Sequence, residues 1–274
     1  MRNKESLPVK TLKCLLAVVF LIPLYIMFNY AFKSAQDIAR YGVALKGGFT
    51  LINFYNALTQ SNLVKAFINS LTSVVFMTAI CIVSSCMAAY VISRNDHRKL
   101  YNAVYYIFLA AIILPFQVIM LPMYRMLRAI GLMNTIPGYI LAMTALQLGY
   151  TVFIITGFIK TIPRELDEAA YVDGANRYHT FFMIIMPLLK PIVMTALILD
   201  GLALWNDLLT AMIILQKQSI HTLTLEQYSF ISQFSTDLGK AFAAFMMSII
   251  PIIILYFSTQ KYIVSSIVSG AIKG

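Results

Sequence analysis

The sequence predicts an all-α, polytopic membrane protein with six transmembrane helices. Of its 274 residues, 60% are hydrophobic and only 12% are charged, whereas a soluble domain carries roughly 25% charged residues. The mean hydropathy of +0.79 leaves too little polar surface to cover a globule in water. Six apolar stretches reach the ~20 residues that a helix needs to cross a ~30 Å hydrocarbon core. These observations argue against a secreted disulfide scaffold, a disordered chain and a cytosolic enzyme.

The first three predicted spans cover residues 12–32, 66–92 and 101–121. The first follows a short basic segment at 1–11, and no small-x-small cleavage site follows it. A membrane helix is therefore predicted there rather than a signal peptide. The third span contains Pro115, which a membrane helix tolerates when neighbouring helices or waters satisfy the carbonyl groups that the proline frees.

The last three predicted spans cover residues 137–159, 191–214 and 239–258. Almost no charge interrupts them, apart from two aspartates in the fifth. A loop at 160–190 separates the fourth span from the fifth, and a tail at 259–274 follows the sixth.

An even number of spans places both chain ends on the same side of the membrane. With the N-terminus inside, the cytoplasmic segments hold thirteen of the Lys and Arg residues and the outer segments hold eight. Cytoplasmic loops carry the excess of basic residues in membrane proteins. We therefore expect both termini in the cytoplasm, and topology explains the net charge of +10 without nucleic-acid binding.

The loop at 160–190 is too long for a simple connector, and its residues predict a first short helix. Pro163 suits a first helical turn, where no intrahelical N–H is needed. Glu165, Asp167 and Glu168 place negative charge near the positive end of that helix. The alternative is a solvated loop whose apolar residues lie at the membrane surface.

A turn and a second helix are predicted to follow in the same loop. Gly174 can adopt the left-handed conformation that ends a helix, and Asn176 can cap the next one. The second helix is expected to run through apolar residues such as Phe181 until Pro187 and Pro191 break it. The two helices would form an elbow that projects into the cytosol.

The elbow resembles the EAA motif of ABC importer permeases. The matching residues are Glu168-Ala169-Ala170, Asp173-Gly174-Ala175, Phe181, Ile185, Pro187-Leu188 and Pro191. The resemblance implies a type I ABC importer permease fold, in which this elbow is the coupling helix that docks into a cleft on a separate cytosolic ATPase. It assigns coupling to Glu168, Ala169, Ala170, Asp173, Gly174 and Ala175. Small alanines allow close approach of a partner, and the two carboxylates can form hydrogen bonds or caps at the joint.

Motifs outside the elbow are similar to the sugar-transporting branch, the maltose-type and multiple-sugar permeases. They are Asn69-Ser70-Leu71, Ala88-Ala89-Tyr90, Arg94, Pro122-Met123-Tyr124, Gly131-Leu132-Met133-Asn134-Thr135, Trp205-Asn206-Asp207 and the ending Gly270-Ala271-Ile272-Lys273-Gly274. This resemblance implies a carbohydrate (oligosaccharide) substrate and a bacterial or archaeal cytoplasmic membrane. It also implies four partner chains: a second homologous permease subunit, two cytosolic ATPase subunits and an extracytoplasmic sugar-binding protein.

Polar residues inside the predicted spans are candidates for the substrate path, because intramembrane polar groups usually face a cavity or a partner helix. The fifth span carries Asp200, Trp205, Asn206 and Asp207, and a carboxylate, an amide and an aromatic ring together suit a sugar. Further candidates are Gln117 in the third span and Gln147 in the fourth. Hydrogen bonding between helices explains the same residues equally well.

The sequence contains no GxxxxGK[ST] phosphate loop, so ATP hydrolysis would have to come from partner chains. The three cysteines and three histidines form no metal-binding pattern, and no cofactor is expected. An ion-coupled secondary transporter is the main alternative function, with Asp200 or Asp207 as a proton relay, but it leaves the elbow unexplained. An ABC permease for a non-sugar solute also remains open, because a coupling motif does not encode the cargo.

Overall fold

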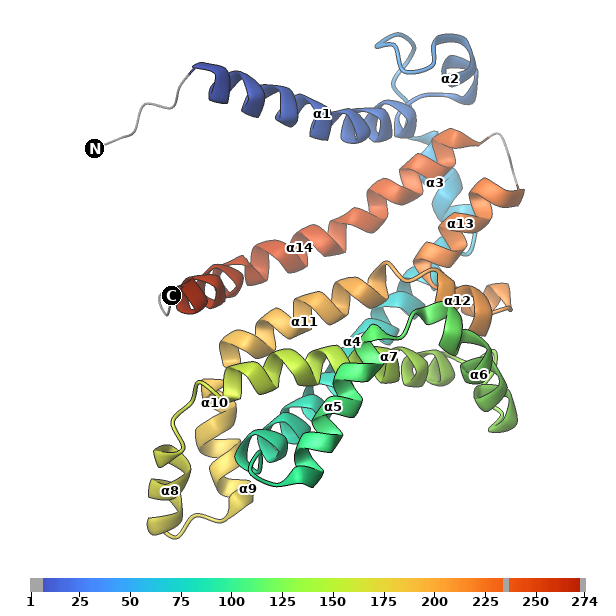
Figure 1. The fold of residues 1–274 in the computed structure, drawn as a ribbon. Helices are drawn as coiled ribbons and strands as arrows, with labels where there is room; N and C mark the ends of the chain where they lie inside the picture. The colour runs from blue at the N-terminus through green and yellow to red at the C-terminus, as the bar shows by residue number, and fades with distance from the viewer. Residues whose placement is uncertain (1–6, 234–236, 272–274) are drawn as a thin grey trace. The chain divides into compact units, whose positions relative to one another are not determined.

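The computed structural model describes residues 7–233 and 237–271, which form helices joined by short loops, with no strand among them (Figure 1). The predicted N-terminal segment before residue 7 and the last three residues of the predicted tail, 272–274, lie outside the described residues. The chain divides into two units. One comprises Met1–Lys65 and Leu225–Pro251, and the other comprises Ala66–Thr224 and Ile252–Gly274.

Within the described residues, four helices are long and apolar enough to cross a membrane: α1 (Leu7–Ala31), α4 (Leu63–Arg94), α7 (Ile136–Ile159) and α14 (Leu238–Ala271). Two bent pairs also meet this test. The first joins α5 (Lys99–Ile113) to α6 (Phe116–Ala129), and the second joins the limb Arg177–Leu188 to α11 (Lys190–Trp205). The structure therefore offers up to six membrane spans.

The third predicted span, 101–121, is not one straight helix. It breaks between α5 and α6, whose axes differ by 106°. The break lies at Leu114 and Pro115, which both have extended backbone angles. A proline ring disfavours the helical conformation in the residue before it, so α5 ends at Ile113.

The fifth predicted span, 191–214, also ends earlier than expected. Helix α11 ends at Trp205, and a short helix α12 (Leu209–Ile214) follows. The Asp207 side chain accepts hydrogen bonds from the backbone N–H groups of Thr210 and Ala211, at 3.3 and 2.9 Å. Because these N–H groups belong to the first turn of α12, Asp207 caps a new helix where the pattern predicted a continuous one.

The first unit contains α1, α2 (Ala35–Tyr41), α3 (Ile52–Thr59) and parts of α13 (Leu223–Gln233) and α14. The buried Asn53 amide on α3 donates to the carbonyl oxygens of Ala31 and Lys33, at 2.9 and 2.7 Å. Lys33 is itself buried, and its ammonium group donates to the Gly42 carbonyl oxygen over 3.0 Å. These bonds satisfy carbonyl groups around the end of α1 and fix the segment that follows it.

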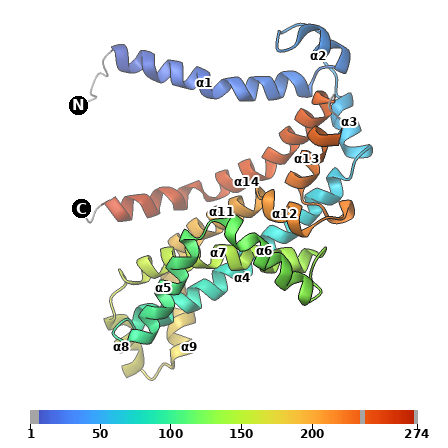
Figure 2. The ribbon, with the colours of Figure 1, turned by 45° about the vertical axis from the view of Figure 1, so that its right-hand side comes forward.

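The second unit is a helical bundle built around α4, α7 and α11. Helix α7 packs against both α5 and α11. A continuous apolar core joins the C-terminal half of α4, the end of α7 and the segment before α11. Its members include Cys86, Ala89, Ile155, Ile159 and Ile185. This core supports the loop that the sequence singled out, which extends from the end of α7 (Figure 2).

Candidate functional site

The loop between α7 and α11 folds into an elbow of two helical limbs. The first limb is α8 (Glu165–Val172). The second consists of α9 (Arg177–His179), a π-helix η1 (Thr180–Ile185) and α10 (Met186–Leu188). The two limbs contact each other and lie side by side in both views (Figures 1 and 2).

The turn between the limbs confirms two local predictions. Gly174 has φ +81°, a left-handed conformation that costs most residues other than glycine. Its N–H donates to the Tyr171 carbonyl oxygen, and the Ala175 N–H donates to that of Ala170. This pair of bonds is a Schellman motif, which ends α8. Asn176 then caps α9, because its Oδ1 accepts from the His179 N–H over 2.9 Å.

Pro187 does not break the second limb, contrary to the expectation from sequence. The limb continues through Pro187 to Leu188 and then bends by 74° into α11. The π-helix immediately before Pro187 has wider turns, and such a turn accommodates a residue that cannot donate a hydrogen bond. Pro191 lies in the first turn of α11, where the missing N–H costs nothing.

The six residues assigned to coupling do not share one environment. Glu168, Ala169, Asp173 and Gly174 are exposed, Ala175 is half-buried, and Ala170 is buried. The small size of Ala170 therefore serves packing inside this chain. Sequence reasoning missed the exposed apolar side chains beside these residues, of which Tyr171 and Val172 are 80% and 84% exposed. Their signal was an apolar pair at the end of a helix whose first turn is acidic. Such a surface is typical of a protein interface.

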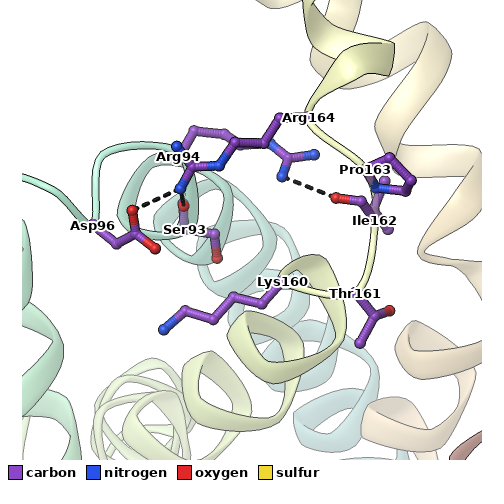
Figure 3. Close-up of a pocket in the computed structure, with 8 residues that line it drawn as sticks. All are labelled: Ser93, Arg94, Asp96, Lys160, Thr161, Ile162, Pro163 and Arg164. Carbon is purple, nitrogen blue, oxygen red and sulfur yellow. Dashed lines mark hydrogen bonds and ion pairs between the residues drawn. The ribbon is translucent and has the colours of Figure 1, made fainter. Parts of the chain in front are cut away.

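Charged and polar side chains hold the first limb to the end of α4. Arg94 Nη2 lies 2.7 Å from Asp167 Oδ2, and the Tyr90 hydroxyl donates to Asp167 Oδ1 over 2.5 Å. Arg94 Nη1 also donates to the Ile162 carbonyl oxygen, as Figure 3 shows. The guanidinium group therefore binds both the loop that leads to α8 and α8 itself.

A second arginine, Arg164, just before α8, also connects the elbow to the end of α4 and the loop after it. Arg164 donates to the Ser93 carbonyl oxygen over 3.2 Å and to Asp96 Oδ1 over 2.6 Å (Figure 3). The hydrogen bond from Arg164 lowers the pKa of the Asp96 carboxyl group, because it favours the charged form. The two arginines border a cavity of about 290 Å³, which is also lined by Lys160, Thr161 and Pro163.

A larger cavity of about 580 Å³ lies in the bundle beside the break between α5 and α6. Three of the six substrate-path candidates line it: Gln147 on α7, and Asn206 and Asp207 after α11. Tyr150 and Thr210 also line it and were not predicted. Tyr150 lies three residues after Gln147, a helical spacing that places both on one face of α7.

The other three candidates do not line this cavity. Asp200 is fully buried, and the Thr151 hydroxyl lies 3.0 and 2.9 Å from its two carboxylate oxygens. Trp205 is only 7% exposed, and its ring packs edge-on against Phe67. Gln117 lies on the exposed side of α6. Asp200 and Trp205 therefore lie apart from the cavity that Asn206 and Asp207 line, although the predicted fifth span carries all four.

Asp207 already has several partners inside this chain. Besides the two N–H groups of α12, its Oδ2 accepts from the Tyr139 hydroxyl over 3.0 Å. Its neighbour Asn206 is exposed, and its amide donates to the Leu202 carbonyl oxygen within its own helix. The exposed Asn206 side chain is therefore more accessible to a ligand than the Asp207 carboxylate, which accepts three hydrogen bonds.

Comparison with known proteins identifies the family. Residues 81–269 match the family described as binding-protein-dependent transport system inner membrane component. The melibiose/raffinose/stachyose import permease protein MelC of Bacillus subtilis is 34% identical over 274 residues, which covers 100% of this chain and 99% of that protein. The multiple sugar-binding transport system permease protein MsmG of Streptococcus mutans is 37% identical and covers 93% of each chain.

A solved structure supports the same fold. It is the crystal structure of a bacterial ABC transporter involved in the import of the acidic polysaccharide alginate. One of its chains superposes with a TM-score of 0.80, at 20% identity, over 92% of this chain and 94% of that one. The chain belongs to the family of binding-protein-dependent transport system inner membrane components and is a multi-pass permease of the ABC importer type.

Proposed function

We propose that this chain is a transmembrane permease subunit of an ATP-driven importer of carbohydrates, with oligosaccharides as the substrate class. The observation that carries the proposal is the similarity to relatives named for melibiose, raffinose, stachyose and multiple sugars, which extends over nearly the whole chain. The chain would form half of the translocation path and leave ATP hydrolysis to partner chains.

The larger cavity supports a carbohydrate substrate on chemical grounds. Its volume of about 580 Å³ falls within the range of roughly 300–1,000 Å³ that is usual for small-molecule sites. Gln147, Tyr150 and Asn206 bring amide and hydroxyl groups to an otherwise apolar wall. Sugar hydroxyl groups can pair with such groups, and apolar C–H faces can contact the wall. We propose Gln147, Asn206 and Asp207 as the substrate path from the predicted set.

The elbow supports coupling to an ATPase. Its first limb ends in exposed apolar residues, Tyr171 and Val172, next to the exposed carboxylates of Glu168 and Asp173. We propose that this surface docks into a cytosolic ATPase subunit. The complete importer would contain a second homologous permease, two ATPase subunits and an extracytoplasmic sugar-binding protein. It would lie in the cytoplasmic membrane of a bacterium or archaeon, with both termini of this chain in the cytoplasm.

The proposal is tested with the complete complex in proteoliposomes. We expect uptake of labelled raffinose or melibiose that requires ATP and the binding protein. Glu168→Lys should weaken retention of the ATPase and reduce uptake. The matched control is Glu165→Lys, which makes the same charge reversal on the same helix outside the motif and should retain uptake.

Two outcomes would contradict the proposal. Uptake that follows an ion gradient without the ATPase would support a secondary transporter. ATP-dependent uptake of a non-sugar solute, with no competition by a panel of oligosaccharides, would remove the substrate class and leave the permease assignment in place.

A further inference from the structure

Some of the motif residues lie outside the proposed docking surface and the larger cavity, near the two ends of α4. Asn69 and Ser70 lie near the beginning of this helix, and Tyr90 and Arg94 lie at its end. Helix α4 contains 32 residues without a break or an internal proline. At 1.5 Å per residue it spans about 48 Å, which exceeds the thickness of the hydrocarbon core.

The inner end of α4 is fastened to both limbs of the elbow. Arg94 and Tyr90 both bind Asp167 on the first limb. The Tyr90 ring packs against Phe181 on the second limb, with centroids 5.1 Å apart. The side chains of Arg94 and Asp167 are only 12% and 20% exposed, so water screens their attraction less than it screens a surface pair.

The other end of α4 is fastened to the segment 221–224, which precedes and begins α13. The Asn69 amide donates to the His221 carbonyl oxygen over 3.0 Å. The buried Ser70 hydroxyl accepts a hydrogen bond from the Leu223 N–H over 2.8 Å. In the same segment, the Thr224 hydroxyl donates to the Trp205 carbonyl oxygen at the end of α11.

The second connection from the elbow toward that segment is less direct. It runs along the chain through the π-helix η1, the 74° bend before α11 and then α11 itself. Residues at the ends of helices can absorb a displacement by changing their backbone angles, whereas an unbroken helix moves as one body. Helix α4 is therefore a stiffer link from the elbow to the segment 221–224 than this path through α11.

We propose that α4 is a strut that transmits displacement of the elbow across the membrane to the segment 221–224, with Arg94 and Ser70 as the positioning residues at its two ends. The proposal rests on the proposed function, because an ATPase is what would displace the elbow. When α8 shifts, the ion pair between Asp167 and Arg94 displaces α4. The opposite end of α4 then displaces Leu223 through the hydrogen bond to Ser70. The chain continues from there into α13.

The test measures whether nucleotide changes the accessibility of a residue next to the segment 221–224. Ser219, an exposed residue just before the segment, is replaced by cysteine in the complete complex. Its rate of reaction with a membrane-impermeant maleimide is measured with and without a non-hydrolysable ATP analogue. The same complex without the Ser219→Cys change reports any reaction of the natural cysteines. We expect nucleotide to change the rate at residue 219.

Three variants then separate the strut from general damage. Arg94→Gln removes the ion pair to Asp167 at the inner end of α4. Ser70→Ala removes the hydrogen bond from Leu223 at the outer end. Arg98→Gln removes a neighbouring exposed arginine as the control. We expect the first two to abolish the nucleotide-dependent change at residue 219 while the ATPase stays bound and hydrolyses ATP. Sugar moved per ATP should fall roughly tenfold, a coupling loss of about 1.4 kcal/mol. Arg94→Lys should restore part of it, and Arg98→Gln should behave as the parent.

The outcomes distinguish this inference from the proposed function. A wild-type complex that transports sugar without any nucleotide effect at residue 219 would overturn the strut, as would a normal effect in Arg94→Gln. If Arg94→Gln fails to assemble, Asp167→Asn removes the same ion pair and keeps an acceptor for Tyr90, and a normal effect there would also overturn it. A nucleotide effect that depends on Arg94 in a complex that takes up no sugar would uphold the strut and refute the substrate class.

Discussion

The Tyr139 hydroxyl on α7 donates a hydrogen bond over 3.0 Å to Oδ2 of Asp207, the residue that caps α12. Tyr139 is fully buried, so this bond ties the wall of the larger cavity to the interior of the bundle. The Asp207 carboxylate therefore has a structural task as well as a place on the cavity wall.

Asp207→Ala should destabilise the permease, because it leaves the Tyr139 hydroxyl and the N–H groups of Thr210 and Ala211 without their acceptor. Loss of hydrogen bonds to a charged group costs about 1.5–3 kcal/mol. Thermal unfolding of the purified complex should show a lower melting temperature. The matched control is Asn206→Ala, because the Asn206 amide donates to the Leu202 carbonyl oxygen within its own helix. It should keep the melting temperature and lower uptake. Equal stability of both variants would argue against the capping role.

Asp200 should be a packing residue rather than a substrate contact. Asp200→Asn keeps an acceptor for Thr151, and we expect uptake and melting temperature close to those of the parent. Thr151→Val preserves shape but removes the hydroxyl donor, so it should cost about 1–3 kcal/mol of stability. Uptake lost in Asp200→Asn at unchanged stability would show instead that the carboxylate acts in transport or proton relay.

Gly174 should tolerate asparagine better than valine. A Cβ built at Gly174 meets no heavy atom within 4 Å in the described part of the chain, so any penalty comes from φ +81° and not from a clash. Asparagine adopts this conformation at low cost, whereas a β-branched residue does not. We expect Gly174→Val to insert into the membrane but lose uptake, through a misdirected first limb. Gly174→Asn should retain most uptake. Similar uptake in both variants would remove the conformational argument.

The topology prediction is tested by cysteine accessibility in a background without the natural cysteines. Asn176→Cys, in the elbow, should react only with reagent on the cytosolic side. Lys46→Cys, in the loop after α2, should react only from outside. Both positions are exposed in the structure, so a failure to react cannot be attributed to burial within this chain. The reverse pattern would invert the orientation and remove the coupling role of the elbow.

The sequence predicted the elbow turn well because its signals are local. A glycine at the end of a short helix acts within one turn of chain, as Gly174 does. So does an asparagine whose side chain accepts a hydrogen bond from the N–H group three residues later, as Asn176 does. Tertiary contacts were beyond such reasoning. Arg94 and Asp167 lie far apart in sequence, and nothing in either neighbourhood indicates the other.

The structure brings together part of the residue set that was predicted for the substrate path. Gln147, Asn206 and Asp207 line the larger cavity, but Asp200 does not. Asp200 and Asp207 are seven residues apart, so they would lie on one face of a continuous helix over the predicted fifth span. The helix ends at Trp205, so that spacing no longer relates the two residues. The hydrogen bonds that Asp207 accepts from the Thr210 and Ala211 N–H groups, which begin α12, are visible only in the structure.

The break at Leu114 and Pro115 places the ends of two helices beside the larger cavity. Each end of a helix carries backbone groups that have no partner within that helix, and such groups are tolerated at membrane depth only where they meet protein or a water-filled space. Both sides of this break line the larger cavity, through Ala111, Ile112 and Phe116. Main-chain hydrogen-bonding groups at the facing ends of α5 and α6 therefore lie along a stretch of this wall whose side chains are apolar. In the proposed substrate path, substitution of side chains along this stretch would leave those main-chain groups in place.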